Sequence, residues 1–148
     1  MLKKIILVSL PILSLGFILN LIWELSQMPL YAGGSYLADH LAQSLYATFW
    51  DSAMVLGIYF VIAAGKRDIF WLRKLGAAEI AAVIILGLAI SIFIEIRALA
   101  ENRWGYSALM PIIPLLEVGL SPILQMMILP SATFVLAAGF LKKLKLIY

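Results

Sequence analysis

The chain has 148 residues, of which 64% are hydrophobic and only 13% charged, and its mean hydropathy is +1.06. This composition excludes a water-soluble domain, because a soluble fold of this size needs a mostly polar exterior. The net charge of +3 does not indicate a nucleic-acid partner, since the basic residues stand in short clusters beside hydrophobic runs.

Four segments are long and apolar enough to cross a membrane, which requires about 20 mostly apolar residues in helical conformation. They are residues 5–28, 41–64, 75–97 and 118–140. The connecting segments are too short for a second domain. We therefore predict that residues 1–148 form one all-α domain, a bundle of four transmembrane helices in an integral membrane protein.

The basic residues predict how this bundle is oriented, because cytoplasmic loops carry an excess of Lys and Arg. Nine lie on one side of the predicted helices and two on the other; the nine are Lys3, Lys4, Lys66, Arg67, Arg73, Lys74, Lys142, Lys143 and Lys145, and the two are Arg97 and Arg103. Both termini and the 65–74 loop are therefore expected in the cytoplasm. Aromatic residues including Trp23, Trp104, Phe70 and Trp71 are expected at the two membrane interfaces.

The first predicted helix carries three polar residues near its outward end. Asn20, Glu24 and Gln27 are spaced i, i+4, i+7, which places them on one face of a helix. Ionisable groups are costly in hydrocarbon, so this face should point into the bundle. Glu24 is a candidate for a functional carboxyl group.

The second predicted helix has a similar stripe at i, i+4, i+8 and i+11, formed by His40, Ser44, Thr48 and Asp51. By helical rise Asp51 lies about 15 Å from the outward end, close to the middle of the membrane. A structural role for Asp51 would require a cation at the same depth. The basic candidates, including His40, all stand nearer the outward edge, which favours a functional role.

The last two predicted helices and the loop between them carry the remaining polar and charged residues near the outward side. Glu95 is close to the outward end of the third helix, and Gln125 is about two turns inside the fourth. Arg97 and Glu101 are spaced for a surface salt bridge, and Glu79 is expected to pair with Arg73 or Lys74. We expect the polar positions of all four helices to converge on one cavity in the outward half of the bundle.

From this pattern we predict Glu24 and Asp51 as catalytic acid and base. The residues expected to contact a ligand are Asn20, Trp23, Gln27, His40, Thr48, Trp50, Glu95, Arg103, Trp104 and Gln125. The chain has no cysteine and no paired-histidine spacing, so we predict neither a metal site nor a cofactor. Nucleotide-binding and serine-hydrolase motifs are also missing from the sequence.

Three stretches of sequence resemble the EXPERA family, which includes the emopamil-binding sterol isomerases and the sigma-2 receptor. They are the acid followed by Gln-Met-Pro-Leu-Tyr in residues 24–31, the Ala-Thr-Phe-Trp-Asp of residues 47–51, and the fourth helix with Leu129-Pro130 and a basic tail. The resemblance implies a four-helix membrane fold and a sterol-like ligand. It also implies that Glu24 corresponds to an acidic residue in the site of the family's isomerases. Asn20 occupies the position at which those isomerases have a histidine.

Our leading hypothesis is a membrane-embedded enzyme or binding protein for an apolar sterol-like or isoprenoid lipid. In such an enzyme, buried carboxyl groups would shift a double bond. Two alternatives remain open at this point: a proton-coupled transporter or channel subunit, and a non-catalytic assembly partner. The expected partners are membrane lipid or an apolar small molecule and a second copy of the chain.

Overall fold

The computed structural model of the chain describes residues 2–32 and 37–144, with side chains described for residues 3–32 and 41–144. Four helices in this part of the chain are long and apolar enough to cross a membrane. They are α1 (Leu2–Gln27), α2 (Leu37–Lys66), α3 (Ala77–Ala100) and α4 (Leu120–Lys143). Each contains the predicted segment almost completely and adds up to one turn at an end, so the prediction of four apolar helices is confirmed.

Two short 3-10 helices and one small hairpin connect the long helices. The 3-10 helices are η1 (Met28–Leu30) and η2 (Trp71–Lys74). Strands β1 (Ile112–Ile113) and β2 (Val118–Gly119) pair antiparallel, with Ile112 opposite Gly119 and Ile113 opposite Val118. Tyr31 and Tyr106 form an isolated antiparallel bridge between the segments after α1 and α3.

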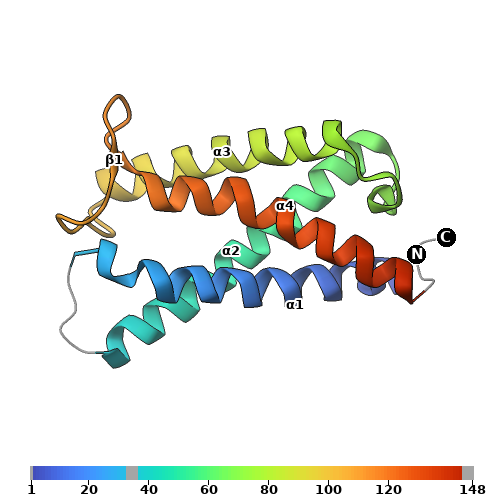
Figure 1. Ribbon diagram of the computed structural model, residues 1–148, viewed down its shortest axis with the longest axis horizontal. Coiled ribbons are helices and arrows are strands. Elements are labelled where there is room, and N and C mark those ends of the chain that lie inside the picture. Colours follow the sequence, from blue (N-terminus) through green and yellow to red (C-terminus); the bar gives the residue numbers. More distant parts are fainter. Residues whose placement is uncertain (1, 33–36, 145–148) are drawn as a thin grey trace.

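The four long helices form a bundle in which the first turn of α1 and the last turn of α4 lie at the same end (Figure 1). We call this the terminus end, and we call the opposite end, which carries residues 28–32 and 101–119, the loop end. Helix α1 packs against α2 and α4, and α3 packs against α4. Helices α2 and α3 contact each other only slightly, because α2 runs obliquely to the others (Figure 1).

The contact between α3 and α4 is close because a glycine permits it. A Cβ atom on Gly87 would lie 1.9 Å from the carbonyl oxygen of Met126, so no larger residue fits against that backbone. Backbone groups, unlike long side chains, cannot move aside. The contact therefore fixes the position of α4 along the axis of α3, and with it the position of Gln125.

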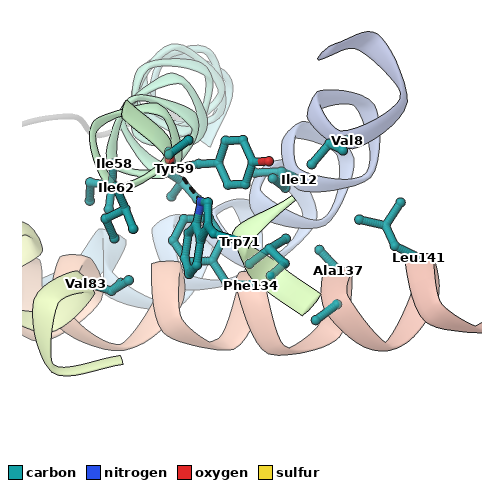
Figure 2. Close-up of a cluster of buried hydrophobic side chains, with 14 of the residues drawn as sticks. Val8, Ile12, Ile58, Tyr59, Ile62, Trp71, Val83, Phe134, Ala137 and Leu141 are labelled. Carbon is teal, nitrogen blue, oxygen red and sulfur yellow. Dashed lines mark hydrogen bonds between the residues drawn. The ribbon is translucent and has the colours of Figure 1, made fainter. Parts of the chain in front are cut away.

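An apolar core fills the terminus half of the bundle (Figure 2). Tyr59, Trp71 and Phe134 lie at its centre, with ring centroids 5.6 Å apart for Tyr59 and Trp71 and 5.5 Å apart for Trp71 and Phe134. The indole nitrogen of Trp71 donates to the carbonyl oxygen of Tyr59 at 3.2 Å. Trp71 is only 2% exposed, so its predicted place in an interfacial belt is wrong. The turn of η2 points it inward instead.

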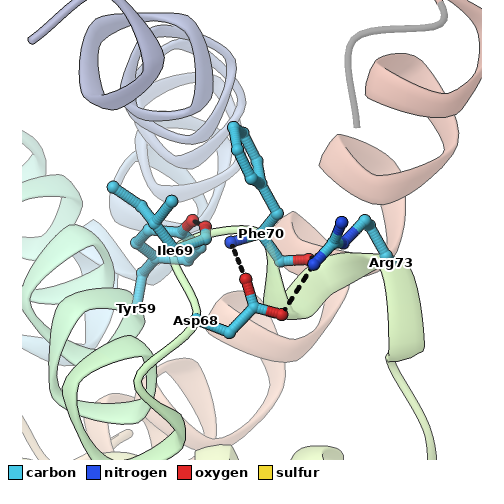
Figure 3. A network of polar contacts seen from close by, with 5 residues as sticks. All are labelled: Tyr59, Asp68, Ile69, Phe70 and Arg73. Carbon is cyan, nitrogen blue, oxygen red and sulfur yellow. Dashed lines mark hydrogen bonds and ion pairs between the residues drawn. The ribbon is translucent and has the colours of Figure 1, made fainter. Parts of the chain in front are cut away.

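The loop between α2 and α3 is held by its own polar contacts (Figure 3). Asp68 accepts hydrogen bonds from the backbone nitrogen of Phe70 at 2.8 Å and from Arg73 at 2.9 Å, and these contacts lower the pKa of Asp68. The Tyr59 hydroxyl donates to the carbonyl oxygen of Ile69. Glu79 pairs with Lys66 at 2.6 Å, so the predicted pairing with Arg73 or Lys74 is wrong.

Candidate functional site

A cavity of about 190 Å³ opens in the loop half of the bundle, where α2 and α3 contact each other only slightly. Its wall is formed by α1, η1, α2, α3, the segment after α3, and α4. The polar residues on this wall are Glu24, Gln27, Tyr31, Gln43, Ser44, Asp51, Ser91, Glu95, Arg103, Trp104 and Gln125. Apolar residues such as Met28, Met54 and Met126 line the remainder.

Gln125 is the centre of the polar network beside this cavity. Its amide nitrogen lies 3.0 Å from Asn20 Oδ1, 2.9 Å from Glu24 Oε1 and 2.9 Å from Asp51 Oδ2. A primary amide has two hydrogens to donate, so it cannot satisfy three acceptors at once. The carboxyl groups around Gln125 therefore need a donor of their own.

The carboxyl groups of Glu24 and Asp51 lie near each other, because Glu24 Oε1 and Asp51 Oδ2 are each 2.9 Å from the same nitrogen of Gln125. Two ionised carboxylates at this separation repel each other and can only accept hydrogen bonds, so the arrangement favours a proton on one of the two groups. The same proton supplies the donor that Gln125 cannot provide. Glu24 and Asp51 thus form a pair that holds one proton between them, as like charges in close contact do elsewhere.

A second amide orients this pair from α1. Gln27 donates to Glu24 Oε1 at 2.7 Å and to Gln125 Oε1 at 2.9 Å. Its own oxygen accepts from the Ser121 hydroxyl at 2.7 Å and from the Trp23 indole at 3.2 Å. Each polar atom of Gln27 is used, which fixes the amide and the Glu24 side chain that it contacts.

The third carboxyl group, Glu95, is held from the segment after α3. The hydroxyl of Tyr106 and the indole nitrogen of Trp104 both donate to Glu95 Oε2, the latter at 3.3 Å. Burial raises the pKa of Tyr106, and the hydrogen bond to Glu95 adds to that rise. Tyr106 therefore remains a neutral donor across the physiological pH range. Burial and the nearby Glu95 raise the pKa of Tyr31 as well.

None of these three carboxyl groups forms an ion pair with a cation among the described side chains. Arg103 lines the cavity, but its guanidinium pairs with Glu101 at 3.0 Å and lies over the Trp104 ring at 5.5 Å. Arg97 also pairs with Glu101, at 2.6 Å, as its spacing predicts. Burying carboxyl groups without a counter-ion is costly, so they persist here through protonation and hydrogen bonding.

The structure brings most of the predicted site residues together. Glu24, Gln27, Asp51, Glu95, Arg103, Trp104 and Gln125 line the cavity, and Asn20 joins through Gln125, donating in turn to the Gly16 carbonyl oxygen at 2.8 Å. The hydrogen-bonded network around Gln125 thus draws on α1, α2 and α4, and α3 contributes Glu95 to the cavity wall.

Three predicted residues are placed differently, and a fourth, His40, stays a prediction. Trp23 reaches the network only through its bond to Gln27, and Trp50 lies outside the cavity wall, 51% exposed on the surface of α2. Thr48 is buried, but its hydroxyl has no partner among the described residues. The side chain of His40 lies outside the described residues.

Several residues of the site were not predicted from sequence as part of it, among them Ser121, Tyr106 and Tyr31. Ser121 lies four residues before Gln125, and that spacing places both on one face of α4. Tyr106 and Tyr31 were interpreted as interfacial aromatic residues. The sequence feature that could have indicated Tyr106 is its place in Trp-Gly-Tyr, which follows Glu95 closely enough for the chain to fold back onto it.

The chain matches no family model, no curated protein and no solved structure.

Proposed function

We propose that this protein is a membrane-embedded enzyme that binds an apolar sterol-like or isoprenoid lipid and moves a double bond within it. The observation that carries the proposal is the pair of Glu24 and Asp51 carboxyl groups, which share Gln125 as a hydrogen-bond donor on the wall of a cavity. A pair with one proton holds an acid and a base side by side. The resemblance to the EXPERA family in residues 24–31 and 47–51 supports the same ligand class.

The proposed reaction uses both members of the pair. The protonated carboxyl group gives its proton to one alkene carbon, whose π electrons form the new C–H bond and leave a cation on the neighbouring carbon. The ionised carboxylate then removes a proton from the next carbon, and the released electron pair forms the shifted double bond. One proton leaves the pair and one returns, so the pair is restored after each turnover.

Aromatic side chains on the cavity wall support the charged intermediate in this proposal. Trp104 and Tyr31 both line the cavity, and an aromatic ring stabilises a cation that approaches its face. The negative charge of the nearby carboxylate would also stabilise the cation. Trp23 and Trp50 were also expected to contact the ligand, but they do not line the cavity, so we assign this role to Trp104 and Tyr31.

The size of the cavity limits how much of the ligand enters. At about 190 Å³ it is smaller than the roughly 300–1,000 Å³ of pockets that enclose a whole drug-sized ligand. We therefore propose that only the reacting ring or isoprene unit enters. The rest of the molecule would remain among the lipids between α2 and α3, which contact each other only slightly.

We further propose that the terminus end lies in the cytoplasm and that the cavity opens in the outer half of the membrane. The basis is the excess of basic residues at the terminus end, which includes Lys3, Lys66, Lys74 and Lys142. In this orientation the ligand approaches the carboxyl pair sideways, from the outer leaflet.

Proton-linked transport is the alternative that the same carboxyl groups suggest. A transport path must continue past Asp51 to the terminus end. There, the described residues form an apolar core in which Val55, Tyr59 and Phe134 are 0% exposed. That packing favours a site open at one end and argues against conduction through a single copy of the chain.

Small molecules that co-purify with the protein test the proposal. Mass spectrometry of an extract from gently purified wild type should show one apolar lipid class in excess over bulk membrane lipid. Ala47→Trp, which fills the cavity from α2, should lose it, and Ala42→Trp, at an exposed site on the same helix, should retain it. Identical lipid profiles in all three proteins would contradict the proposal.

A further inference from the structure

The segment between α3 and α4 contains an apolar hairpin, residues 111–120, that plays no part in the proposed chemistry. Its two short strands pair at Ile112 with Gly119 and at Ile113 with Val118. The turn is fixed by bonds from the backbone nitrogens of Leu116 and Glu117 to the Ile113 carbonyl oxygen, at 3.1 Å and 2.8 Å. The shape of the hairpin is therefore defined by its own backbone.

The tip of this hairpin is exposed and almost free of charge. Leu115 is 96% exposed and Ile112 43% exposed, and Glu117 is the only charged residue between positions 108 and 120. A leucine side chain is more stable in an apolar environment than in water. Apolar surface held out by a rigid turn indicates a contact with another apolar phase.

The direction of the hairpin indicates which phase that is. In Figure 1 it extends sideways from the loop end, across the helix axes instead of along them. If the helices cross a membrane, such a hairpin runs parallel to the membrane surface. A hairpin directed at a soluble partner would instead continue along the helix axes and away from the lipid.

The position of the hairpin along the helix axes also agrees with a location at the membrane surface. Helix α3 has 24 residues and is therefore about 36 Å long, whereas the hydrocarbon core is about 30 Å thick. Its ends thus reach the headgroup zone, and β2 contacts α3 at that level. The charged residues Arg97, Glu101 and Arg103, at the end of α3 and just beyond it, suit the same polar zone.

We propose that the hairpin lies in the membrane interface with Leu115 inserted among the lipid chains, and so anchors the loop end of the bundle. The base of the hairpin connects this anchor to the site. Val118 is fully buried, and a Cβ on Gly119 would lie 3.1 Å from the ring of Tyr106, which holds Glu95. The anchor thus also keeps the Glu95 wall of the cavity in place.

Spin labels on single cysteines test the proposal, because the chain has no cysteine of its own. Leu115→Cys is compared in lipid nanodiscs with two references on or next to α3, Phe93→Cys, on the exposed surface of that helix, and Glu101→Cys, at its end. The readout is relaxation by dissolved oxygen, which concentrates in lipid, against relaxation by a water-soluble nickel chelate.

We expect the label at position 115 to favour oxygen over the chelate, with a ratio nearer that of position 93 than that of position 101. A ratio equal to that of position 101 would leave the tip in the polar zone, outside the lipid chains, and overturn the proposal. Protection from both reagents would show that protein covers the tip, and would overturn it equally. Leu115 is almost fully exposed, so its replacement should leave the fold intact.

Discussion

Glu24 on α1 and Asp51 on α2 place their carboxyl groups near each other, an arrangement that favours a proton on one of the two groups. Gln125 on α4 contacts both carboxyl groups, at 2.9 Å each. The pair therefore links three helices and at the same time holds a proton that a ligand in the cavity could receive. Structural and chemical roles of the pair can be separated by substitution.

Asp51→Asn should leave stability nearly unchanged. The new amide can donate to Glu24 as a protonated carboxyl group does, and its oxygen can still accept from Gln125. We expect the free energy of unfolding to change by less than about 1 kcal/mol, measured as thermal or denaturant unfolding in detergent. A loss of about 3–5 kcal/mol would instead indicate that the substitution had stranded a buried cation.

Gln125→Met should destabilise the bundle, because it removes the donor shared by Asn20, Glu24 and Asp51 while keeping a side chain of similar size. Leaving buried acceptors unsatisfied should cost about 1–3 kcal/mol, visible as a lower melting temperature. Gln43→Met is the matched control, since Gln43 is exposed at the cavity rim, and it should change stability by less than about 0.5 kcal/mol. Equal effects would show that Gln125 is not the centre of the network.

Gly87→Ala should separate α3 from α4 near Gln125, since the added methyl group would meet the Met126 carbonyl oxygen at 1.9 Å. Overpacking of this kind costs about 1–3 kcal/mol or more. Gly57→Ala adds the same methyl group where no atom lies within 4 Å, and should be neutral or stabilising because alanine favours helix. A Gly87→Ala protein as stable as Gly57→Ala would contradict the close contact.

The sequence predicted the four helices because each is a long apolar run between charged or turn-forming segments. Spacing also placed Glu24, Gln27, Asp51 and Gln125 on inward faces, since polar groups avoid lipid. It could not assign partners, because hydrogen bonds between helices depend on their relative rotation and height. The Gly87 contact that sets the height of α4 involves a backbone carbonyl, which leaves no trace in a residue pattern.

Aromatic residues were harder to place from sequence. Trp71 follows a basic cluster, as interfacial tryptophans do, yet η2 turns it into the core against Tyr59 and Phe134. Trp104 and Tyr106 are likewise aromatic residues beside charged residues at a helix end, but they fold back and donate hydrogen bonds to Glu95. In each case the short turn before the residue determines its direction, and amphipathic rings fit either environment.

The proposed orientation predicts a definite labelling pattern. A single cysteine at Glu101 should react with a membrane-impermeant thiol reagent added to intact cells, and one at Lys74 should react only after the membrane is opened. Both side chains are exposed, at opposite ends of α3 and its preceding turn. Labelling of position 74 alone in intact cells would reverse the orientation.

Deuterium transfer tests the central claim most directly, namely that the Glu24–Asp51 pair exchanges a proton with a bound lipid. Wild-type protein carrying its co-purified lipid is incubated in D2O, and the extracted lipid is analysed by mass spectrometry. We predict that wild type incorporates carbon-bound deuterium, and that Asp51→Asn retains the lipid but incorporates at least about tenfold less. Lipid that stays unlabelled in wild type, or is labelled equally in Asp51→Asn, would contradict the account.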